Sequence, residues 1–379
     1  MIRLERAFLF AMYNGIRMYE LEAADIERLV SWYRKNKRCF PWRDTKDPYH
    51  VWISEIMLQQ TRTEAVISYF ERFLKQVPDI KALSLIEDDD LNRLWEGLGY
   101  YSRARNLKKC AIKLMEEHGG KLPEDHEALL KLPGIGPYTA GAIMAIGFGR
   151  PYPAIDGNVL RVLARYFAIA DDIRQDATKN VITKAVEDYY RKEDQDREFV
   201  KDLTQAFMDL GAVVCIPNGA PRCDECPLKD HCEAYKKKLI DKIPYRSPLK
   251  QRKIIDRTLF IIRNGDRFLL RKRVEKGLLA GLYEFIGVDE KLNAEKTKEY
   301  LTEKGYDVLH LKKLPDSKHV FSHIEWHMDA YEVKIGNWDI PLKENEILVN
   351  KAELQKLAIP SAFKTYIEYY ALRESEDEL

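Results

Sequence analysis

The chain has 379 residues, of which 45% are hydrophobic and 32% are charged. This length favours two or three domains, and the hydrophobic fraction is sufficient for a core in each. No segment approaches the roughly eighteen apolar residues of a membrane-spanning helix. We therefore expect an intracellular protein without a membrane partner, located in the cytoplasm or nucleoid, or in the nucleus of a eukaryote.

The N-terminal part of the chain is predicted to be mostly helical. Residues 1–17 carry no clear pattern, so Met18 is an alternative translation start, and we assign residues 1–20 to an N-terminal extension. After this extension, apolar residues recur at helical spacing, for example Val66, Phe70 and Phe73. This periodicity continues through the following motifs and predicts an α-helical domain.

VWISEIMLQQTR, residues 51–62, is the first motif with chemical content. Glu55 is the only charged residue from Val51 to Leu58, a run that is otherwise apolar apart from Ser54. A carboxyl group in apolar surroundings has a raised pKa, so it can act as a general acid near neutral pH. A glutamate on the wet face of an amphipathic helix is the simpler interpretation, and this motif alone favours it.

Two further motifs contain a glycine-rich turn and an aspartate. In LPGIGPYTAGAI, residues 132–143, Gly134 and Gly136 permit a tight turn whose amides and following helix suit a phosphate. An ordinary helix–turn–helix connection is the alternative. In PAIDGNVLRVLAR, residues 153–165, Asp156 stands at a predicted helix start, where an aspartate is most often a cap. Asp156 follows Gly136 by twenty residues, which is long enough for the chain to place Asp156 in one cleft with the glycine-rich turn.

Four of the six cysteines lie close together in the sequence. Seven, two and five residues separate Cys215, Cys223, Cys226 and Cys232. Because a reducing cytosol disfavours disulfides, this set predicts a metal centre. Zinc and an iron–sulfur cluster both accept four thiolates, and the spacing alone does not choose between them.

Cys39 and Cys110 stand apart from this set. Neither has an assignable role, and we expect both to be buried thiols rather than ligands.

A basic stretch divides the chain. Although the net charge is only +1, residues 233–276 contain 15 Lys and Arg against 5 Asp and Glu. This charge suits a polyanionic partner, and a solvated linker is the alternative. Pro244 and Pro248 interrupt the stretch, so we assign residues 236–253 to a basic linker.

The second part of the chain is predicted to mix helices and strands. The runs 257–263, 267–273 and 329–335 are β-rich, and turns are expected at Asn264-Gly265 and Gly336-Asn337. A domain over residues 254–371 is therefore expected, followed by an acidic tail at 372–379 that we expect to be disordered.

The segment from His323 to Met328 alternates polar and apolar residues. His323, Glu325 and His327 alternate with Ile324, Trp326 and Met328, which predicts a strand with one wet face. A metal site built from the two histidines and the glutamate is the less favoured alternative.

Taken together, the motifs resemble those of one family. PWRDTKDPYHVWISEIMLQQTR, LWEGLGYYSRARNL, the glycine-rich turn, the IDGNV run and the cysteines occur in the order found in the adenine DNA glycosylases of the helix-hairpin-helix superfamily, often called MutY. The resemblance runs from about Phe40 to Cys232. It resumes at GLLAGLYEFIG and HVFSHIEWHM, which resemble segments of the family's C-terminal Nudix-like domain.

The fold and cofactor follow from this resemblance. It implies a multidomain chain, with an all-α helix-hairpin-helix glycosylase core over residues 21–235 and an α+β Nudix-like domain over 254–371. The loop 215–232 would hold a [4Fe–4S] cluster, although its first cysteine interval has seven residues where the family usually has six. No Nudix catalytic helix follows Gly287, so nucleotide diphosphate hydrolysis is not expected.

The resemblance also implies a reaction. A monomeric base-excision repair enzyme would hydrolyse the N-glycosidic bond of adenine mispaired with 8-oxoguanine or guanine in double-stranded DNA. Glu55 would protonate the flipped adenine, and Asp156 would stabilise the positively charged sugar. Tyr138 stands where bifunctional relatives carry a Schiff-base lysine, and a phenol cannot form that imine, so no efficient strand-cleaving step is expected.

Other positions take their roles from the resemblance alone. Tyr138 and Asn158 would line the pocket, and Arg43 and Asp209 would hydrogen-bond the adenine. Residues expected to contact the DNA or sense 8-oxoguanine are Gln59, Gln60, Thr61, Leu98, Tyr100, Gly134, Gly136, Phe321, Ser322 and His323.

Some positions depart from the family pattern. Leu160 stands where bacterial members often have a lysine, so contact with the lesion strand is expected to differ. Leu279, Tyr283 and Ile286 replace tryptophan, tryptophan and proline. A mismatch-thymine glycosylase of the same superfamily and a non-catalytic iron–sulfur DNA-binding protein remain the alternatives.

Overall fold

The computed structural model describes residues 19–371, except 44, 46, 193–195, 249–250, 275–276, 339–340 and 355. Most of the expected N-terminal extension, including Met18, and the whole acidic tail therefore lie outside the described residues. The chain divides into two compact units. One contains Met1–Ser84 and Lys109–Pro248, and the other contains Leu85–Lys108 and Leu249–Leu379. Within the part described, no helix is long and apolar enough to cross a membrane.

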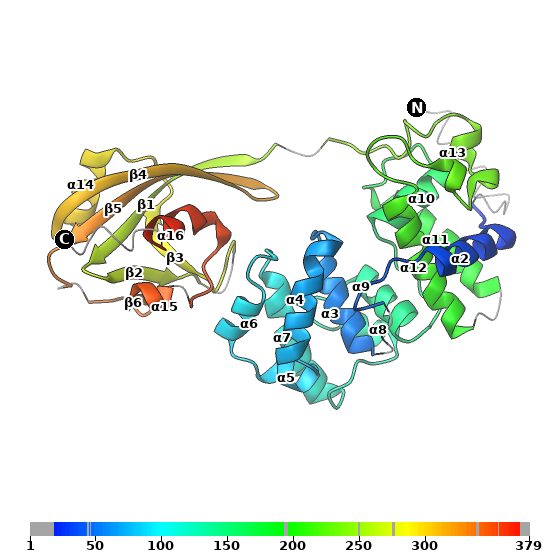
Figure 1. Cartoon of the computed structure of the whole chain (residues 1–379), viewed down its shortest axis with the longest axis horizontal. Coiled ribbons are helices and arrows are strands. Elements are labelled where there is room, and N and C mark those ends of the chain that lie inside the picture. The colour runs from blue at the N-terminus through cyan, green and yellow to red at the C-terminus, as the bar shows by residue number, and fades with distance from the viewer. Residues whose placement is uncertain are drawn as a thin grey trace. The chain divides into compact units, whose positions relative to one another are not determined.

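The first unit is built from helices (Figure 1), so the predicted all-α core is confirmed. These helices are α2 (Ala23–Asn36), α3 (Pro48–Leu58), α4 (Thr63–Gln76), α5 (Ile80–Leu85), α8 (His126–Leu130), α9 (Pro137–Ala142), α10 (Gly157–Tyr166), α11 (Asp176–Lys192), α12 (Arg197–Val213) and α13 (Glu233–Lys236). Short π-helical and 3-10 segments lie at Ile143–Gly147, Cys223–Glu225 and Lys229–His231. Helix α7 (Ser102–Glu117) crosses the boundary between the two units.

Helix α3 is buried on nearly every side. Asp47 caps its first turn by accepting a hydrogen bond from the Tyr49 amide, and Pro48 occupies the first helical position, where its missing N–H costs nothing. Its residues from Val51 to Met57 are all buried. A helix that is apolar all round belongs inside a domain, which explains why Glu55 does not face solvent.

Helices α2, α10 and α12 pack together around the main core of the first unit. This core includes Ile26, Leu29, Leu163, Leu203 and Phe207, all nearly inaccessible to solvent. Because α10 begins at the Asp156 cap, the core fixes the position of that carboxylate.

The segment after α13 remains packed on the helical unit. Ile243 is buried, and its carbonyl accepts a hydrogen bond from Arg165 Nε at 2.7 Å. Tyr245 forms an isolated bridge with Asp172. Contacts place the chain up to Pro248 in the first unit, which includes much of the segment 236–253 that we expected to be a linker.

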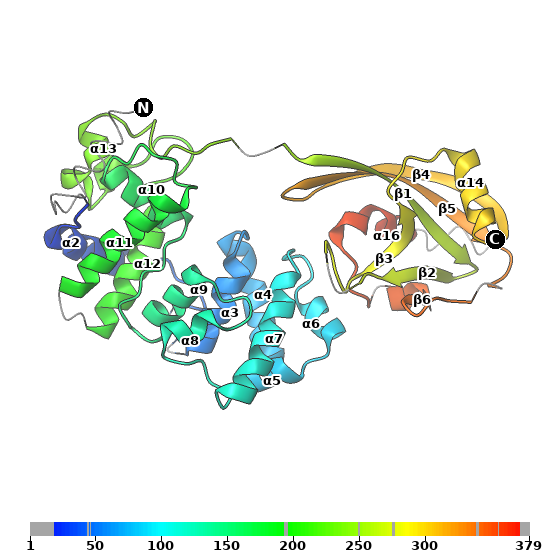
Figure 2. The ribbon, with the colours of Figure 1, turned by 180° about the vertical axis from the view of Figure 1, so that it is seen from behind.

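The second unit contains a mixed sheet (Figure 2). Its strands are β1 (Lys253–Asn264), β2 (Arg267–Lys272), β3 (Tyr283–Val288), β4 (Val308–Val320), β5 (Ile324–Ile335) and β6 (Glu346–Val349), in the order β4-β5-β1-β3-β2-β6. Only β1 and β5 pair in parallel among these strands. Helices α6 (Asp88–Leu94), α14 (Ala294–Glu303), α15 (Lys351–Leu354) and α16 (Lys364–Ala371) complete the unit.

The sheet has a helix on each face. Alternation along β1 places Leu259 on one face, where it packs with Phe363 and Tyr366 near and in α16. Phe260 lies on the other face and packs with Leu301 of α14. The predicted α+β Nudix-like domain is therefore confirmed as a sheet between two apolar layers.

Candidate active site

A pocket in the first unit brings together residues that are far apart in the sequence. Those predicted from the sequence are Arg43, Glu55, Gln59, Gln60, Thr61, Tyr138, Asp156 and Asn158. They come from the segment before α3, from α3 and the turn after it, and from the starts of α9 and α10. Residues that the sequence did not single out as site residues include Arg38, Phe40, Trp42, Gln205 and Met208.

Glu55 is buried in this pocket, with only 6% of its surface exposed. Burial raises the pKa of its carboxyl group to about 7, against the opposing effects of the Tyr138 hydrogen bond and the Arg43 charge. The Tyr138 hydroxyl donates to Glu55 Oε2 at 2.5 Å. A group with this pKa holds a proton in a large fraction of molecules at neutral pH, as a general acid requires.

Asp156 lies in a different environment. Its Oδ1 accepts from the amides of Asn158 and Val159 at 2.8 and 2.7 Å, and its Oδ2 accepts from Asn158 Nδ2 at 2.9 Å. Burial raises its pKa above the usual value, but these hydrogen bonds act in the opposite direction. The helix N-terminus also favours the ionised form. Asp156 is thus both a helix cap and a carboxylate in the pocket.

Two glycines permit the close packing that positions Asp156. A Cβ at Gly141 of α9 would lie 2.1 Å from the Pro153 carbonyl oxygen, on the segment that leads to Asp156. A Cβ at Gly211 of α12 would lie 2.5 Å from Asn158 Cβ. Both distances are too short for real contacts, so any larger residue at either position would force its neighbours to shift.

Asp209 does not line the pocket. It is fully buried, and its Oδ1 accepts from Arg38 Nη2 at 2.7 Å and from Arg43 Nη2 at 2.8 Å. The Arg43 Nη1 atom also donates to the Tyr33 hydroxyl at 2.9 Å. Asp209 therefore fixes two arginines that do line the pocket. No local sequence signal singles out Arg38, because its link to Arg43 runs through Asp209, 166 positions beyond Arg43.

Residues predicted to contact DNA occupy unusual backbone conformations. Gln60 and Tyr100 have positive φ angles of 58° and 47°, which are uncommon for residues other than glycine. Tyr100 is also 46% exposed. Among the hairpin glycines, Gly134 has a φ of 77°, whereas Gly136 is extended and caps α9. Strained backbone of this kind is concentrated at functional sites.

The predicted recognition residues of the second unit form a turn. The Phe321 amide donates to the Ile324 carbonyl at 2.8 Å, and the Lys253 amide donates to the His323 carbonyl at 3.1 Å. The Phe321 ring packs edge-on against Trp326. This arrangement leaves Ser322 and His323 exposed. Leu98 and Tyr100, which group with this unit, line one pocket with Phe321, Ser322 and His323.

The alternation predicted for His323 to Met328 is confirmed. Trp326 and Met328 are buried in the sheet, whereas His327 Nε2 lies 2.7 Å from Glu325 Oε1 on the wet face. Lys318 Nζ also pairs with Glu325 at 2.6 Å. His327 and Glu325 thus already have partners within the sheet.

The remaining predicted positions differ in burial. Leu160 lies in the main core, so it does not project from the surface as a lysine there would be expected to. Cys110 is buried, and burial raises its pKa to about 12. The prediction that Cys39 is buried is wrong, because Cys39 is exposed. Its neighbours Arg38 and Phe40 both line the pocket.

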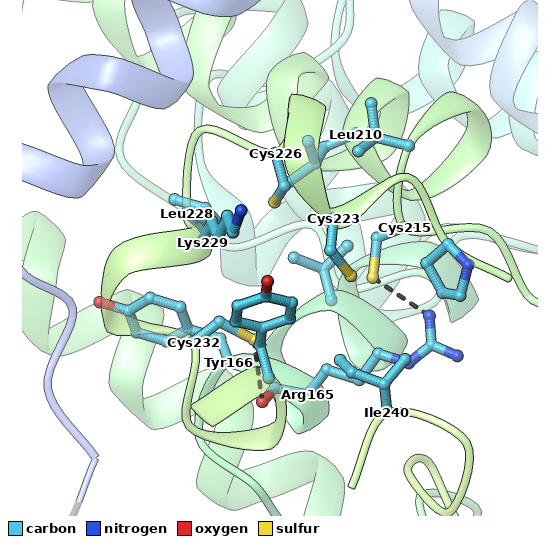
Figure 3. A pocket seen from close by; sticks show the side chains of 14 residues that line it. Arg165, Tyr166, Leu210, Cys215, Cys223, Cys226, Leu228, Lys229, Cys232 and Ile240 are labelled. Atoms are coloured by element: carbon cyan, nitrogen blue, oxygen red, sulfur yellow. Dashed lines mark hydrogen bonds between the residues drawn. The ribbon is translucent and has the colours of Figure 1, made fainter. Parts of the chain in front are cut away.

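The four clustered cysteines line a second pocket (Figure 3). It has a cavity volume of about 30 Å³ and is walled by Val162, Leu210 and Leu228, among other apolar residues. The sulfur atoms surround a common space rather than one point. Among the described residues, no three His, Cys, Asp or Glu side chains converge as the ligands of a single ion.

The surroundings of these thiols suit a centre that binds thiolates. Arg165 Nη1 lies 3.3 Å from Cys215 Sγ, where it can balance negative charge. Burial raises the pKa of Cys226 to about 12 and also raises those of Cys223 and Cys232. A metal centre that bound these thiols would have to displace their protons, so its binding would be coupled to deprotonation.

Comparisons with known proteins agree with this architecture. The chain matches the family described as HhH-GPD superfamily base excision DNA repair protein over residues 53–188, and the NUDIX domain family over residues 258–369. Among solved structures, a thermostable thymine-DNA glycosylase is similar, with a TM-score of 0.51 and 27% identity. That likeness covers 56% of this chain and 95% of the solved chain.

Two curated relatives extend the similarity beyond the helical core. An adenine DNA glycosylase of Buchnera aphidicola (subsp. Acyrthosiphon pisum) is 32% identical over 345 residues, which cover 90% of this chain and 96% of that protein. The adenine DNA glycosylase of Homo sapiens is 32% identical over 363 residues, which cover 80% of this chain and 65% of the human protein.

The two helices α8 and α9 joined by a glycine turn, the pocket with the buried Glu55 and the half-buried Asp156, and the cysteine loop together define the class of helix-hairpin-helix base-excision DNA glycosylases. The C-terminal Nudix-like domain points to a narrower family within this class. The adenine DNA glycosylase of Buchnera is similar to the chain over both the helical part and the Nudix-like part. The chain belongs to the adenine DNA glycosylase family.

Proposed function

We propose that this protein removes adenine from double-stranded DNA by hydrolysis of its N-glycosidic bond. The observation that carries the proposal is Glu55, a buried carboxyl group with a pKa near 7, in the same pocket as Asp156. Family membership makes adenine the expected base. Two carboxyl groups in different environments are the arrangement needed to divide acid and charge-stabilising roles.

The proposed reaction begins with a flipped adenine in the pocket. Glu55 donates its proton to the base, the bond between the sugar and the base nitrogen breaks, and the bonding electrons leave with the adenine. The ionised Asp156 stabilises the positive charge that develops on the sugar. Water then adds to the sugar carbon, and its proton returns to the Glu55 carboxylate.

Other pocket residues orient these groups. Tyr138 fixes Glu55 through its hydroxyl, and Asn158 fixes Asp156 through its side-chain amide. Arg38 and Arg43 would face the adenine, and Asp209 would position both arginines through its hydrogen bonds to them. Because Tyr138 cannot form an imine, we expect release of the base without efficient cleavage of the strand.

We further propose that the mispaired partner is 8-oxoguanine or guanine. Gln59, Gln60, Thr61, Leu98 and Tyr100 would fill the gap left by the adenine, and the strained backbone at Gln60 and Tyr100 supports that role. Gly134 and Gly136 would contact the DNA backbone. The exposed Ser322 and His323 would read the 8-oxoguanine. The protein would act as a monomer inside the cell, in the cytoplasm or nucleoid, or in the nucleus of a eukaryote.

The proposed cofactor is a [4Fe–4S] cluster held by Cys215, Cys223, Cys226 and Cys232. In such a cluster each thiolate binds a different iron, whereas four zinc ligands would all lie about 2.3 Å from one ion. Four sulfurs around a common space fit the cluster better. When bound, the cluster would cross-link the end of α12 to the loop at residues 223–232.

The decisive experiment measures single-turnover base release from labelled duplexes that contain adenine opposite 8-oxoguanine, adenine opposite guanine, or thymine opposite guanine. We expect release from both adenine duplexes, with strand breaks mainly after alkali. Glu55→Gln should lower the rate about 10²- to 10⁴-fold. Glu71→Gln, which changes an exposed glutamate of α4, is the matched control.

Two other outcomes would point elsewhere. The likeness to a thymine-DNA glycosylase makes release from the thymine duplex alone the specific rival result. Tight binding of all three duplexes without release would instead indicate a non-catalytic DNA-binding protein.

A further inference from the structure

Helix α2 contacts the cysteine loop at both ends of one segment. This segment, residues 227–231, connects Cys226 to Cys232. At its start, Arg28 Nε donates to the Pro227 carbonyl at 3.3 Å. At its end, His231 Nδ1 lies 3.0 Å from both carboxylate oxygens of Asp25. One turn of α2 therefore holds the segment that joins two of the four cysteines.

Asp25 is the centre of this contact. Its side chain is fully buried, and a buried carboxylate requires donors to offset the loss of water. The Tyr166 hydroxyl donates to Asp25 Oδ2 at 2.6 Å, and Arg28 Nη2 forms a close ion pair with Oδ1. The contact with His231 is a hydrogen bond to the Asp25 carboxylate in the tautomer that carries a proton on Nδ1.

Tyr166 extends the contact to the wall of the cysteine pocket. It lies in α10 and is one of the residues that line this pocket, as Figure 3 shows. Leu228, between the two attached ends of the segment, is buried in the main core. Asp25 thus joins three parts of the chain, namely α2, α10 and the loop, and two of its partners are more than 140 residues away in the sequence.

We propose that Asp25 and Arg28 form a brace, the α2 brace, that keeps the Cys226–Cys232 side of the loop closed and so limits the rate of cluster loss. This inference rests on the proposed [4Fe–4S] cofactor. When the backbone of Cys226 or Cys232 moves away from a bound cluster, the adjoining 227–231 segment must move with it. That movement breaks the hydrogen bonds to Asp25 and Arg28 first.

The brace has no part in the chemistry of base release. Neither Asp25 nor Arg28 lines the pocket that contains Glu55 and Asp156. A freshly loaded variant should therefore release adenine at the wild-type single-turnover rate, while its cluster is lost faster. This separation distinguishes the brace from a residue that acts in the reaction.

The test uses three variants of the full chain. Asp25→Asn keeps the size of the side chain but removes its charge, and Arg28→Met removes both contacts of the arginine. Arg34→Met is the matched control, because Arg34 also lies on α2 but pairs with Asp202 of α12 at 2.6 Å instead of the loop. The exposed fractions of the two arginine side chains are similar, 42% and 53%.

The measurements are iron per chain, the decay of the visible absorbance of the cluster in a chelator, and the far-UV circular dichroism spectrum. We expect Asp25→Asn and Arg28→Met to lose the cluster about tenfold faster than wild type, since hydrogen bonds to charged groups are the strong ones. Arg34→Met should match wild type. The circular dichroism spectra before cluster loss should be the same for all four proteins.

The outcomes separate the brace from the cofactor. If the wild-type protein binds iron and all three variants lose the cluster at the wild-type rate, the proposed α2 brace is overturned, whereas the proposed cofactor is supported. If wild type purifies without iron, or with zinc, the cofactor proposal fails and the brace fails with it. If Asp25→Asn does not fold, Arg28→Met against Arg34→Met still decides the question.

Discussion

At the scale of single residues, the pocket assigns different roles to two carboxyl groups through their environments. Glu55 sits among apolar side chains of α3, and burial raises its pKa to about 7. Asp156 accepts three hydrogen bonds at a helix N-terminus, which favours its ionised form. The same side-chain chemistry can therefore supply an acid and a stabilising anion at one pH.

This difference predicts the pH dependence of base release. Under the proposed mechanism the protonated form of Glu55 is the active one, so the single-turnover rate should be level below pH 6 and fall about tenfold per unit above pH 8. Single-turnover assays from pH 5 to 9 check this. The residual rate of Glu55→Gln should lack the fall. A rate that rises through pH 7 would contradict the role of Glu55 as the acid.

Burial of Glu55 also has a cost in stability that depends on pH. The folded pKa of about 7 lies above the usual value of 4.5 for a glutamate, so folding is favoured below pH 4.5 and this advantage is lost as the pH rises through 7. At pH 8, Glu55→Gln should raise the free energy of unfolding by up to about 3 kcal/mol. Urea unfolding at pH 5 and pH 8 measures the difference, which should be small at pH 5.

The exposed glutamate Glu71 provides the control for this prediction. Glu71→Gln should change the free energy of unfolding little at either pH, because its side chain is exposed in both the folded and the unfolded chain. Equal gains for the two variants at pH 8 would mean that net charge, rather than burial, is responsible.

At the scale of elements, the close approach of α9 to the segment before Asp156 depends on one glycine. Gly141→Ala would place a Cβ 2.1 Å from the Pro153 carbonyl oxygen, and the backbone must shift to accept it. Overpacking of this kind costs about 1–3 kcal/mol. We expect a lower free energy of unfolding together with slower base release, because Asp156 moves with the shifted segment.

Gly136→Ala tests whether the close approach is the cause. Gly136 caps the same helix, but nothing lies within 4 Å of its added Cβ. Gly136→Ala should therefore lower the free energy of unfolding much less than Gly141→Ala does. Urea denaturation compares the two variants, and equal losses would refute the explanation from packing.

At the scale of the whole molecule, the sheet domain should decide which opposite base is preferred. The turn at Phe321–His323 is closed by backbone hydrogen bonds to Lys253 and Ile324, which leaves Ser322 and His323 exposed. We expect His323→Ala to lower the ratio of the rates on adenine opposite 8-oxoguanine and opposite guanine by about tenfold. The rate opposite guanine should stay near that of wild type.

A histidine elsewhere in the same domain is the control. His310 is exposed on β4, away from the turn, so His310→Ala should preserve the ratio. Single-turnover rates on the two duplexes give the ratio for each variant. If His323→Ala slowed both duplexes equally, the turn would contribute to DNA binding in general and not to recognition of the opposite base.

Local features of the sequence determined much of this protein. The apolar run around Glu55 was compatible with a buried acid, although by itself it favoured a glutamate on a wet helix face. The position of Asp156 predicted a cap, and the alternation after His323 predicted a strand. Each depends on residues a few positions apart, and helical and strand periodicity act over that range. The spacing of the cysteines likewise predicted a metal centre without any knowledge of the fold.

Only the tertiary structure decided which distant residues support these groups. In the structure Asp209 accepts hydrogen bonds from Arg38 and Arg43, whereas the resemblance had implied a contact of Asp209 with adenine. The structure also leaves Cys39 exposed. It also joined Asp25 to His231, 206 positions further along the chain. Such pairs depend on how helices pack on a shared core, and no local spacing specifies that packing.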